Sequence, residues 1–445
     1  MSKKQLNLFD LVMIVVSLVI GMGIFKTPVT AAARTGTPSL FFLAWIVGGG
    51  IALCGALTYA EIGSRYPVTG GYFKIFSYGY HPSLAFAVNC IILVSNAGST
   101  AVVGVIGAEY IGYFFYHGSP APEIFRQLVT IGGVAFFYII NLLGLRMSSR
   151  VQNILTLFKI LLILLLLMSF FGHHSLTAHP LLSHPSGPGG IHLSLLKAFG
   201  FGLVAVSFSY GGYQQSINFG GEVARPGRTI PRGIGYGIVI IILLYLSLNF
   251  VYVRVIGFEQ LKTADSIAAI LMEHLFGPVG DKILRVLMFI SVMAYVNVSL
   301  MSNPRVMYAM SEEGILPAAF RKKTVSREVI VWSLTLFSAT IIITLLFSST
   351  VEKIINYTIF LDSIGFATSA STIFILRHRK TGEEKEIYRM KLFPLVPLIF
   401  ILAYVCVATS IVADDPSSAL YGALIFACCF GLYFILKGRP GRRPA

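Results

Sequence analysis

The residues of this chain best placed to bind a charged group lie at an interruption in its first apolar segment. Gly21 and Gly23 fall two positions apart in the middle of an apolar run from residue 8 to residue 33. Each glycine costs a helix about 1 kcal/mol relative to alanine, so the pair predicts a break. The helix that resumes beyond such a break presents free N–H groups and the positive end of its dipole, which together attract a carboxylate. The alternative is that the two glycines only allow neighbouring helices to approach closely.

A second interruption of the same kind follows later in the chain. The stretch from Ser209 to Tyr213, which includes Gly211 and Gly212, divides an apolar segment that extends from residue 195 to about residue 219. Two glycine-interrupted spans in corresponding halves of a membrane protein are the best sequence pointer to a transport site. Together the two interruptions predict a small-molecule site near the middle of a bilayer.

Isolated charges inside apolar segments are the other candidates for chemistry. Lys159 lies within the segment 150–172, where a lysine costs about 3 kcal/mol on some scales. It could replace a coupling sodium ion and tie the first broken helix to the eighth span, or it could snorkel to the membrane surface. Asp362 could carry a proton, counter a cation or form a structural pair. Lys26 could face an outer vestibule, although outward snorkelling explains it better.

Polar and aromatic side chains near these positions give weaker signals. Asn297, with Ser299, could form hydrogen bonds across helices, but helix packing alone would explain both. Aromatic residues at the second interruption could close over a bound molecule, or they could fill space between helices. These are Phe208, Tyr210 and Tyr213. The neutral Gln214 follows, so this region offers no obvious carboxylate for a cationic ligand and favours a neutral one.

The composition places these residues in a membrane. The chain has 445 residues, of which 56% are hydrophobic and 12% are charged, and this balance excludes a soluble globular domain. Its apolar segments predict an all-α polytopic membrane protein with 12 transmembrane helices. The first of them is too long for a cleaved signal peptide. The predicted spans are 8–33, 38–63, 83–116, 126–146, 150–172, 195–220, 233–256, 281–310, 329–348, 353–377, 392–413 and 418–437.

The charged residues outside the spans predict the orientation. The net charge is +15, and lysine and arginine are about three times as frequent in the loops on the N-terminal side as in those on the other side. This asymmetry predicts that both termini lie in the cytoplasm, and it explains the positive charge without a nucleic-acid partner. Glu61, Glu109 and Glu222 lie near span ends, where a hydrated or capping role is expected. The five cysteines lie in apolar segments and are expected to be packed thiols.

The order of the spans predicts an internal repeat. Residues 1–172 hold the first five spans and residues 195–377 the next five, and each set begins with a broken helix. The first set starts on the inner side and the second on the outer side, which is typical of an inverted-topology repeat. Residues 392–437 supply spans 11 and 12, which lie outside the repeat within the same transporter unit.

Two segments between the spans have compositions of their own. Residues 70–76 predict a short amphipathic segment that lies at the inner interface. Residues 173–192 form the longest outer loop and hold five histidines, a composition that can indicate metal binding. These histidines lack helical ligand spacing and have no neighbouring cysteine or acid cluster, so a solvated loop is expected. We expect no metal and no cofactor.

Four stretches together carry a family resemblance. They are Gly21–Phe25; Ala60–Gly63 with Gly70–Tyr72; Phe208–Tyr213 with Glu222 and Pro226; and Asn297–Arg305 with Glu313–Pro317. In these stretches and in its span count the chain resembles bacterial members of the amino acid–polyamine–organocation superfamily. It is similar in particular to the L-type amino acid transporters and the arginine–agmatine exchangers.

The resemblance implies a LeuT-type fold and a main-chain site. It implies that the substrate carboxylate meets the amides of Met22 and Gly23, and that the ammonium meets carbonyls near Val19, Phe208 and Gly211. The residues expected to contact substrate are Val19, Gly21, Met22, Gly23, Ile24, Phe208, Ser209, Tyr210, Gly211 and Tyr213. Those expected to act in gating or coupling are Lys159, Phe208, Gln214, Asn297 and Asp362. The resemblance makes Phe208 an aromatic gate and Lys159 the substitute for sodium.

The chain departs from the family pattern at three places. Many relatives have a glutamate where this chain has Gln214, which puts proton-linked gating there in doubt. Met22 replaces a smaller residue and could narrow the pocket or turn away from it. The light chains of heteromeric transporters carry a cysteine between spans three and four, but the segment 117–123 has none. We therefore expect no disulfide-linked ancillary subunit.

These observations predict a sodium-independent permease or exchanger of neutral L-amino acids that works by alternating access. We expect it in the cytoplasmic membrane, as a monomer or homodimer. A proton-coupled symporter is one alternative. A non-transporting membrane nutrient sensor is another, although residues 437–445 are too few for a signalling domain. A membrane enzyme would need clustered histidines or acids within the spans.

Overall fold

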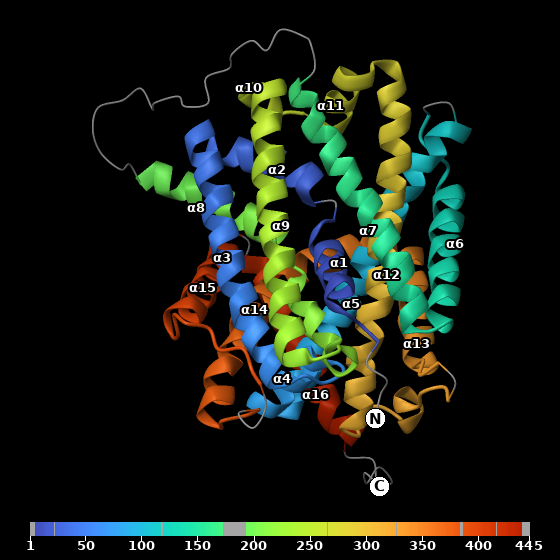
Figure 1. The fold of residues 1–445 in the computed structure, drawn as a ribbon, viewed down its shortest axis with the longest axis vertical. Coiled ribbons are helices and arrows are strands. Elements are labelled where there is room, and N and C mark those ends of the chain that lie inside the picture. Colours follow the sequence, from blue (N-terminus) through green and yellow to red (C-terminus); the bar gives the residue numbers. More distant parts are fainter. Residues whose placement is uncertain are drawn as a thin grey trace.

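The structure, a computed structural model of the whole chain, describes residues 5–437 except 22, 117–118, 172–192, 265, 326, 383–385 and 415. Figure 1 shows that this part of the chain is a bundle of helices. Its only strand pairings are two isolated bridges, Leu6 with Val223 and Thr69 with Phe219. The histidine-rich segment 173–192, for which we expect a solvated loop, lies outside the described residues.

The helices follow the predicted spans closely. They are α1 (Leu8–Val19), α2 (Gly23–Thr35), α3 (Pro38–Arg65), α4 (Gly71–Gly79), α5 (Pro82–Phe115), α6 (Glu123–Leu142), α7 (Leu145–Met168), α8 (Leu193–Ser209), α9 (Pro226–Val255), α10 (Phe258–Leu261), α11 (Ile267–Phe276), α12 (Pro278–Glu312), α13 (Val331–Leu346), α14 (Ser348–His378), α15 (Leu395–Asp414) and α16 (Pro416–Lys437). Short 3₁₀ helices lie at η1 (Ser169–Phe171), η2 (Tyr213–Asn218), η3 (Gly220–Glu222) and η4 (Ala318–Arg321).

Eight helices in the described part of the chain are long and apolar enough to cross a membrane: α3, α5, α6, α7, α9, α12, α15 and α16. The bent pair of α1 and α2 adds a ninth if it is counted as one span. α8 and α13 include apolar stretches that are shorter. The chain is thus an all-helical, multi-pass membrane protein, while the total of twelve spans stays a prediction.

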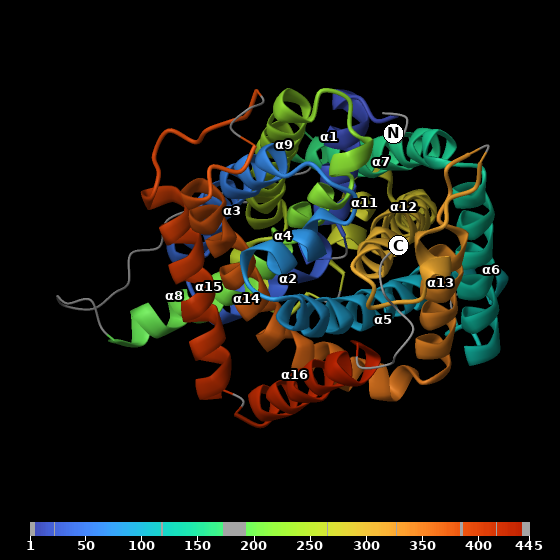
Figure 2. The ribbon, with the colours of Figure 1, turned by 90° about the horizontal axis from the view of Figure 1, so that it is seen from below.

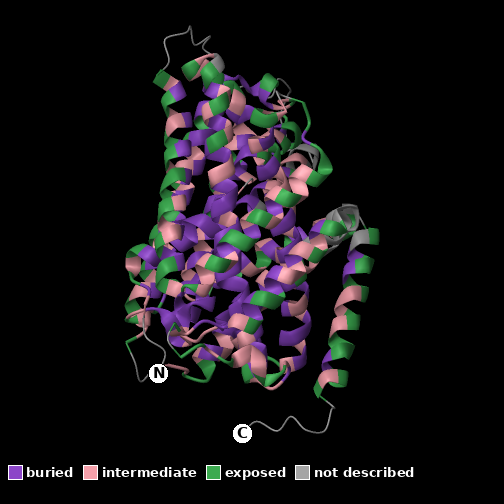
Figure 3. Ribbon diagram, turned by 90° about the vertical axis from the view of Figure 1, so that its right-hand side faces the viewer, coloured by how far each residue is buried: buried purple, intermediate pink, exposed green. Residues whose placement is uncertain are grey.

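The bundle is apolar on the outside as well as in its core. Ile124 on α6, Leu402 on α15 and Leu424 on α16 are more than half exposed, and exposed residues run along the outer helices in Figure 3. Buried residues fill the interior and include many polar side chains, such as Gln152 and Asn297, which are fully buried. This distribution suits a protein whose outer surface faces lipid.

The two broken helices lie together inside the bundle. α1 packs on α7 and α9, α2 packs on α8, and η2 contacts α1. α12 packs against α5 and α7, so α5, α7 and α12 form a wall beside α1. This arrangement brings the first break, at residues 20–22, to the second break, at residues 210–212.

Both termini lie at one end of the molecule, which is the lower end in Figure 1; we call it the terminal end. Figure 2, a view onto this end, shows α4 lying over the bundle, and this helix includes most of the predicted amphipathic segment. Gly70 begins it with a φ of 69°, and a Cβ at this position would lie 2.3 Å from the Arg305 carbonyl oxygen. Only glycine allows this approach.

Candidate functional site

The first break is present where the paired glycines predict it. α1 ends at Val19 and α2 begins at Gly23, and the axes of the two helices differ by 44°. Ile20 has extended backbone angles, with φ −72° and ψ 90°. The amide groups in the first turn of α2 have no carbonyl of the preceding turn to bond, because that turn is absent. The break therefore leaves the N–H groups in the first turn of α2 without helical partners.

The second break lies directly against the first helix. α8 ends at Ser209 and η2 begins at Tyr213. Gly212 has a φ of 114°, and a Cβ at this position would lie 2.4 Å from the Leu18 carbonyl oxygen. Only glycine fits such a close approach between two main chains at a positive φ. The Gly212 amide donates a 2.9 Å hydrogen bond to Oε1 of Gln214, which steadies the turn.

A cavity of about 330 Å³ lies between the two breaks and α5, α12 and α14. The breaks contribute Leu18, Val19, Gly21, Gly23, Ser209, Gly211, Gly212, Gln214 and Gln215. The opposite wall contributes Asn96, Val103, Tyr295, Ser299, Asn303, Asp362 and Phe366. A cavity of this volume, with free main chain on one side and polar side chains on the other, is suited to a small polar molecule.

The two glycines of the first break play different parts. Among the described residues, a Cβ at Gly21 would have no atom within 4 Å, so Gly21 faces open space there and not a described neighbouring helix. A Cβ at Gly23 would lie 3.0 Å from Ser209 Oγ. Close helix packing thus explains Gly23 in part, but it does not explain Gly21.

The polar wall opposite the breaks is a hydrogen-bonded network between α5 and α12. Asn96 Nδ2 donates to Oδ1 of Asn303 at 2.7 Å, and Asn303 Nδ2 donates to Oγ of Ser299 at 3.1 Å. The Ser299 and Thr100 hydroxyls lie 2.8 Å apart. The sequence drew attention to Ser299 but gave no sign of Asn96 or Asn303. These side chains are neutral, so the part of the wall formed by α5 and α12 can exchange hydrogen bonds with a ligand without adding charge.

Asp362 on α14 lines the same cavity. No hydrogen bond or ion pair joins its carboxylate to the part of the chain that the structure describes, so the structural-pair interpretation has no support there. The sequence suggested that the site has no carboxylate for a ligand cation. The structure places one on the cavity wall, far along the chain from either break.

Lys159 is buried behind the first break. The side chain is fully buried, which rules out snorkelling. Its Nζ donates to the Ile20 carbonyl oxygen at 2.6 Å, to Ser17 Oγ at 3.3 Å and to the Ser17 carbonyl oxygen at 3.5 Å. All three acceptors belong to the end of α1, so the ammonium supports the carbonyls that the break leaves without helical partners. Lys26, by contrast, is exposed, as outward snorkelling predicts.

Several predicted site residues do not line the cavity. Tyr210 is buried against the Trp45 and Tyr245 rings, with centroids 5.8 Å and 5.2 Å away. Tyr213 is also buried, and its ring centroid lies 6.1 Å from that of Tyr59. These two tyrosines fill space between helices, which was the alternative interpretation.

Ile24 is fully buried in the core, and Asn297 lies away from the cavity in a hydrogen-bond network with α6 and α7. The Val19 carbonyl oxygen accepts hydrogen bonds from the Gly21 amide at 2.8 Å and the Tyr245 hydroxyl at 3.2 Å. Met22 and the Phe208 side chain lie outside the described structure.

Glu61 has a role that the sequence analysis missed. Its carboxylate is fully buried and accepts hydrogen bonds from Arg65 Nε at 2.7 Å, from Arg377 Nη2 at 2.7 Å and from the Met390 amide at 2.9 Å. The expected hydrated or capping role is wrong at this position. The spacing of Glu61 and Arg65, four residues apart on one helix, was the available signal. The cluster joins α3, α14 and the loop before α15.

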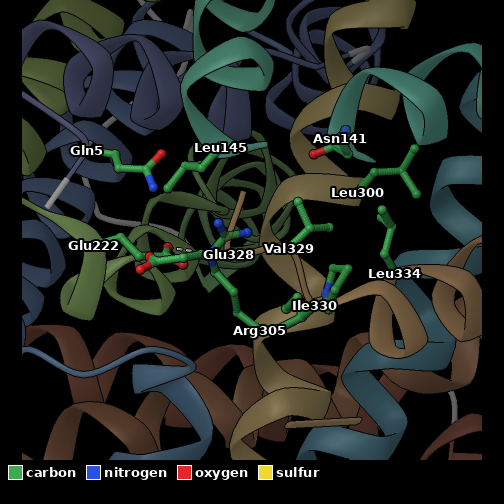
Figure 4. A pocket seen from close by; sticks show the side chains of 11 residues that line it. Gln5, Asn141, Leu145, Glu222, Leu300, Arg305, Glu328, Val329, Ile330 and Leu334 are labelled. Carbon is green, nitrogen blue, oxygen red and sulfur yellow. Dashed lines mark hydrogen bonds and ion pairs between the residues drawn. The ribbon is translucent and has the colours of Figure 1, made fainter. Parts of the chain in front are cut away.

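Glu222 is also paired and buried, with an oxygen 2.6 Å from Arg305 Nε. The pair borders a pocket of about 40 Å³ near the terminal end, shown in Figure 4 with Asn141 on its far side. Glu109, in contrast, is exposed and pairs with Arg126 at 2.9 Å. Within the described residues, no group of three or more histidines, cysteines or acids could hold a metal ion.

Known proteins resemble this chain along almost its whole length. The family model described as amino acid permease matches residues 6–435. The serine/threonine exchanger SteT of Bacillus subtilis is 27% identical over 448 residues, which cover 98% of each chain. The human cystine/glutamate transporter is 26% identical over 97% of this chain and 85% of its own length. The rat large neutral amino acids transporter small subunit 2 is 27% identical over 89% of this chain and 74% of its own.

Proposed function

The chain belongs to the amino acid permease family, and we propose that it is a sodium-independent permease or exchanger of neutral L-amino acids that works by alternating access. As the sequence predicts, it is a membrane transporter and not an enzyme. The observation that carries the proposal is the cavity between two broken helices, with the free amides of α2 on its border.

The main chain of the breaks would hold the two charged ends of the substrate. The amides at Met22 and Gly23 lie at the positive end of the α2 dipole and would bind the carboxylate. The ammonium would meet carbonyl oxygens of the second break, at Phe208 and Gly211. At the first break, the Val19 carbonyl would have to exchange its present donors for the ammonium. Open space beside Gly21 leaves room for the ligand.

The opposite wall would contact the substrate side chain and determine which side chains can bind. Its amides and hydroxyls, at Asn96, Ser299 and Asn303, are neutral and can donate or accept hydrogen bonds. This supports small neutral side chains with a polar group. The similarity to a serine/threonine exchanger favours the same class.

Lys159 would supply the positive charge that a sodium ion supplies in sodium-dependent transporters. Its ammonium donates to the carbonyls at the end of α1, and such carbonyls can coordinate a cation in transporters with broken helices. A covalently attached cation needs no sodium gradient, so transport would be independent of external sodium.

The overall arrangement would be a LeuT-type fold. Spans 1–5, within residues 1–172, and spans 6–10, within residues 195–377, would form the two inverted repeats, with 392–437 added. We infer that the chain lies in the cytoplasmic membrane with both termini in the cytoplasm, as its charge asymmetry predicts.

The subunit composition is a separate proposal. The rat relative is named a small subunit. Residues 117–123 of this chain hold no cysteine, so we propose that it acts without a disulfide-linked subunit, as a monomer or homodimer.

Asp362 keeps a second function open. A carboxylate on the cavity wall that is not paired with any described residue could bind and release a proton in each cycle, which would make the protein a proton-coupled symporter. A proton gradient imposed on proteoliposomes that contain no internal amino acid separates the two functions. Gradient-driven accumulation that is lost in Asp362→Asn would establish symport, and its absence in the parental protein would exclude it.

Flux in proteoliposomes tests the main proposal. Purified protein is reconstituted in sodium-free buffer with unlabelled serine inside, and uptake of labelled amino acids is measured one at a time. We expect uptake of small neutral amino acids with no response to added sodium. Uptake that requires sodium would refute the proposal. The proposal would also be refuted if no amino acid that stabilises the purified protein against heat were taken up.

A further inference from the structure

The connection between the first broken helix and α12 is made by glutamine, and not by lysine as the sequence suggested. Within the described residues, each hydrogen bond of Lys159 Nζ goes to Ser17 on α1 or to Ile20 directly after it. The side chain of Gln152, two turns earlier on α7, joins the two helices. Its Nε2 donates to Ser17 Oγ at 2.7 Å, and its Oε1 accepts from Asn297 Nδ2 at 2.8 Å.

The connection continues to a fourth helix. Asn297 Oδ1 accepts a 3.1 Å hydrogen bond from Nδ2 of Asn141 on α6. Asn141 lines the small pocket near the terminal end (Figure 4). We call the three side-chain amides of Asn141, Asn297 and Gln152 the amide relay. In each link the amide nitrogen donates to the next oxygen, and the relay ends at the Ser17 hydroxyl oxygen that also accepts from Lys159.

Burial makes the amide relay strong and its parts interdependent. Gln152, Asn297 and Ser17 are fully buried, so water does not compete for their hydrogen bonds. Removing one amide leaves a donor or acceptor of its neighbour unpaired in the interior, which costs more than the net gain of the bond.

The helices that the relay joins differ in their freedom to move. α1 has 12 residues and is separated from α2 by the break, so it can tilt as a short unit. α6, α7 and α12 pack on one another. A contact between α1 and this group therefore limits how far α1 can tilt away from it.

We propose that Gln152 is a positioning residue of the transport cycle and that the amide relay is the latch that holds α1 closed. Gln152 aligns the Ser17 hydroxyl with Lys159 and couples α1 to α12 and α6. The relay must part between Gln152 and Ser17 when α1 tilts and the cavity opens toward the terminal end. This inference rests on the proposed transport function, because only a transporter needs such an opening.

Hydrogen exchange of the α1 amides tests the latch without any transport measurement. The variants Gln152→Leu and Asn297→Leu each remove one of the three amides of the relay. We expect exchange of residues 8–19 to accelerate about tenfold in each, since the closed state loses a buried hydrogen bond. Asn249→Leu is the matched control, because Asn249 is an equally buried asparagine of α9 that bonds only the Tyr245 carbonyl among the described residues.

The sidedness of transport separates positioning from general stability. In proteoliposomes of defined orientation, we expect both variants to lower the apparent KM on the terminal side and raise it on the other side. The ratio of the two KM values should change about tenfold, because a ligand binds more weakly when fewer molecules hold the competent conformation. The double variant should change it no further than either single variant, since both break one unit.

Two variants at the ends of the relay test the same prediction if a leucine variant does not fold. Ser17→Ala and Asn141→Ala shorten the relay at its ends and should shift the KM ratio in the same direction. The proposal is overturned if α1 exchange and the KM ratio of the relay variants match those of Asn249→Leu, or if the two leucine changes simply add. A parental protein without flux would refute the proposed function, while the exchange data would still decide on the latch.

Discussion

The Lys159 ammonium nitrogen lies 2.6 Å from the carbonyl oxygen of Ile20, the first residue after α1. This carbonyl has lost the helical partner that a continuous helix would give it, and the lysine takes the partner's place. The fully buried ammonium of Lys159 and the break after α1 thus stabilise each other, although 139 positions separate Lys159 from Ile20 in the sequence.

We expect Lys159→Ala to fold but to lose at least about tenfold in exchange rate, because the Ile20 carbonyl is then buried without a donor. Initial rates of labelled amino acid exchange in sodium-free proteoliposomes measure the loss. Lys26→Ala, which removes an exposed lysine close to the same break, is the control and should keep the parental rate. Parental exchange by the Lys159→Ala protein would mean that its ammonium has no part in transport.

Gly21→Val should abolish ligand binding with little effect on the fold. A Cβ at Gly21 meets no atom of the described residues within 4 Å, so a valine side chain would enter the cavity that Gly21 lines. The measurement is a thermal-shift titration, in which the unliganded melting temperature should stay within a few degrees of the parental value. Gly23→Val should also lose binding, with an added cost from contact with Ser209. Ligand-induced stabilisation retained by Gly21→Val would place the substrate elsewhere.

At the second break, Gly212→Ala is expected to destabilise the protein by about 1–3 kcal/mol. The positive φ disfavours any Cβ, and the added methyl group would press on the Leu18 carbonyl oxygen. A lower melting temperature and a reduced yield of monodisperse protein would register this. Gly50→Ala serves for comparison, since a Cβ at Gly50 meets nothing within 4 Å. Equal stability of the two alanine variants would show that the main chains of the breaks are not in tight contact.

Replacing Glu61 by glutamine should cost about 3–5 kcal/mol, because it removes the carboxylate that pairs with the buried guanidinium group of Arg65 and with the partly exposed one of Arg377. The melting temperature should drop by several degrees more than in Glu109→Gln, which breaks only an exposed pair. If the two variants had the same melting temperature, the cluster around Glu61 would contribute no more to stability than a surface ion pair.

Local features of the sequence predicted much of the candidate site. The two breaks, the membrane setting and the buried lysine follow from local features: paired glycines within apolar runs, the length of those runs, and a charge where water is absent. Each of these features acts through the residues immediately around it, so a single sequence contains the information.

The lining of the cavity was harder to predict. Asn96, Asn303 and Asp362 come from three helices that are distant in sequence, and their positions around each helix axis depend on how the helices pack. Tyr210 and Tyr213, next to the second break, turn instead toward the helix-packing core.

The sequence by itself thus determined where the membrane helices break, because a helix is interrupted by the conformational preferences of its own residues. Only the tertiary structure decided which side chains face the cavity and which partners Lys159, Gln152 and Glu61 bind. Apart from the pairing of Glu61 with Arg65 on one helix, those choices depend on contacts between segments more than 100 residues apart, which no local pattern specifies.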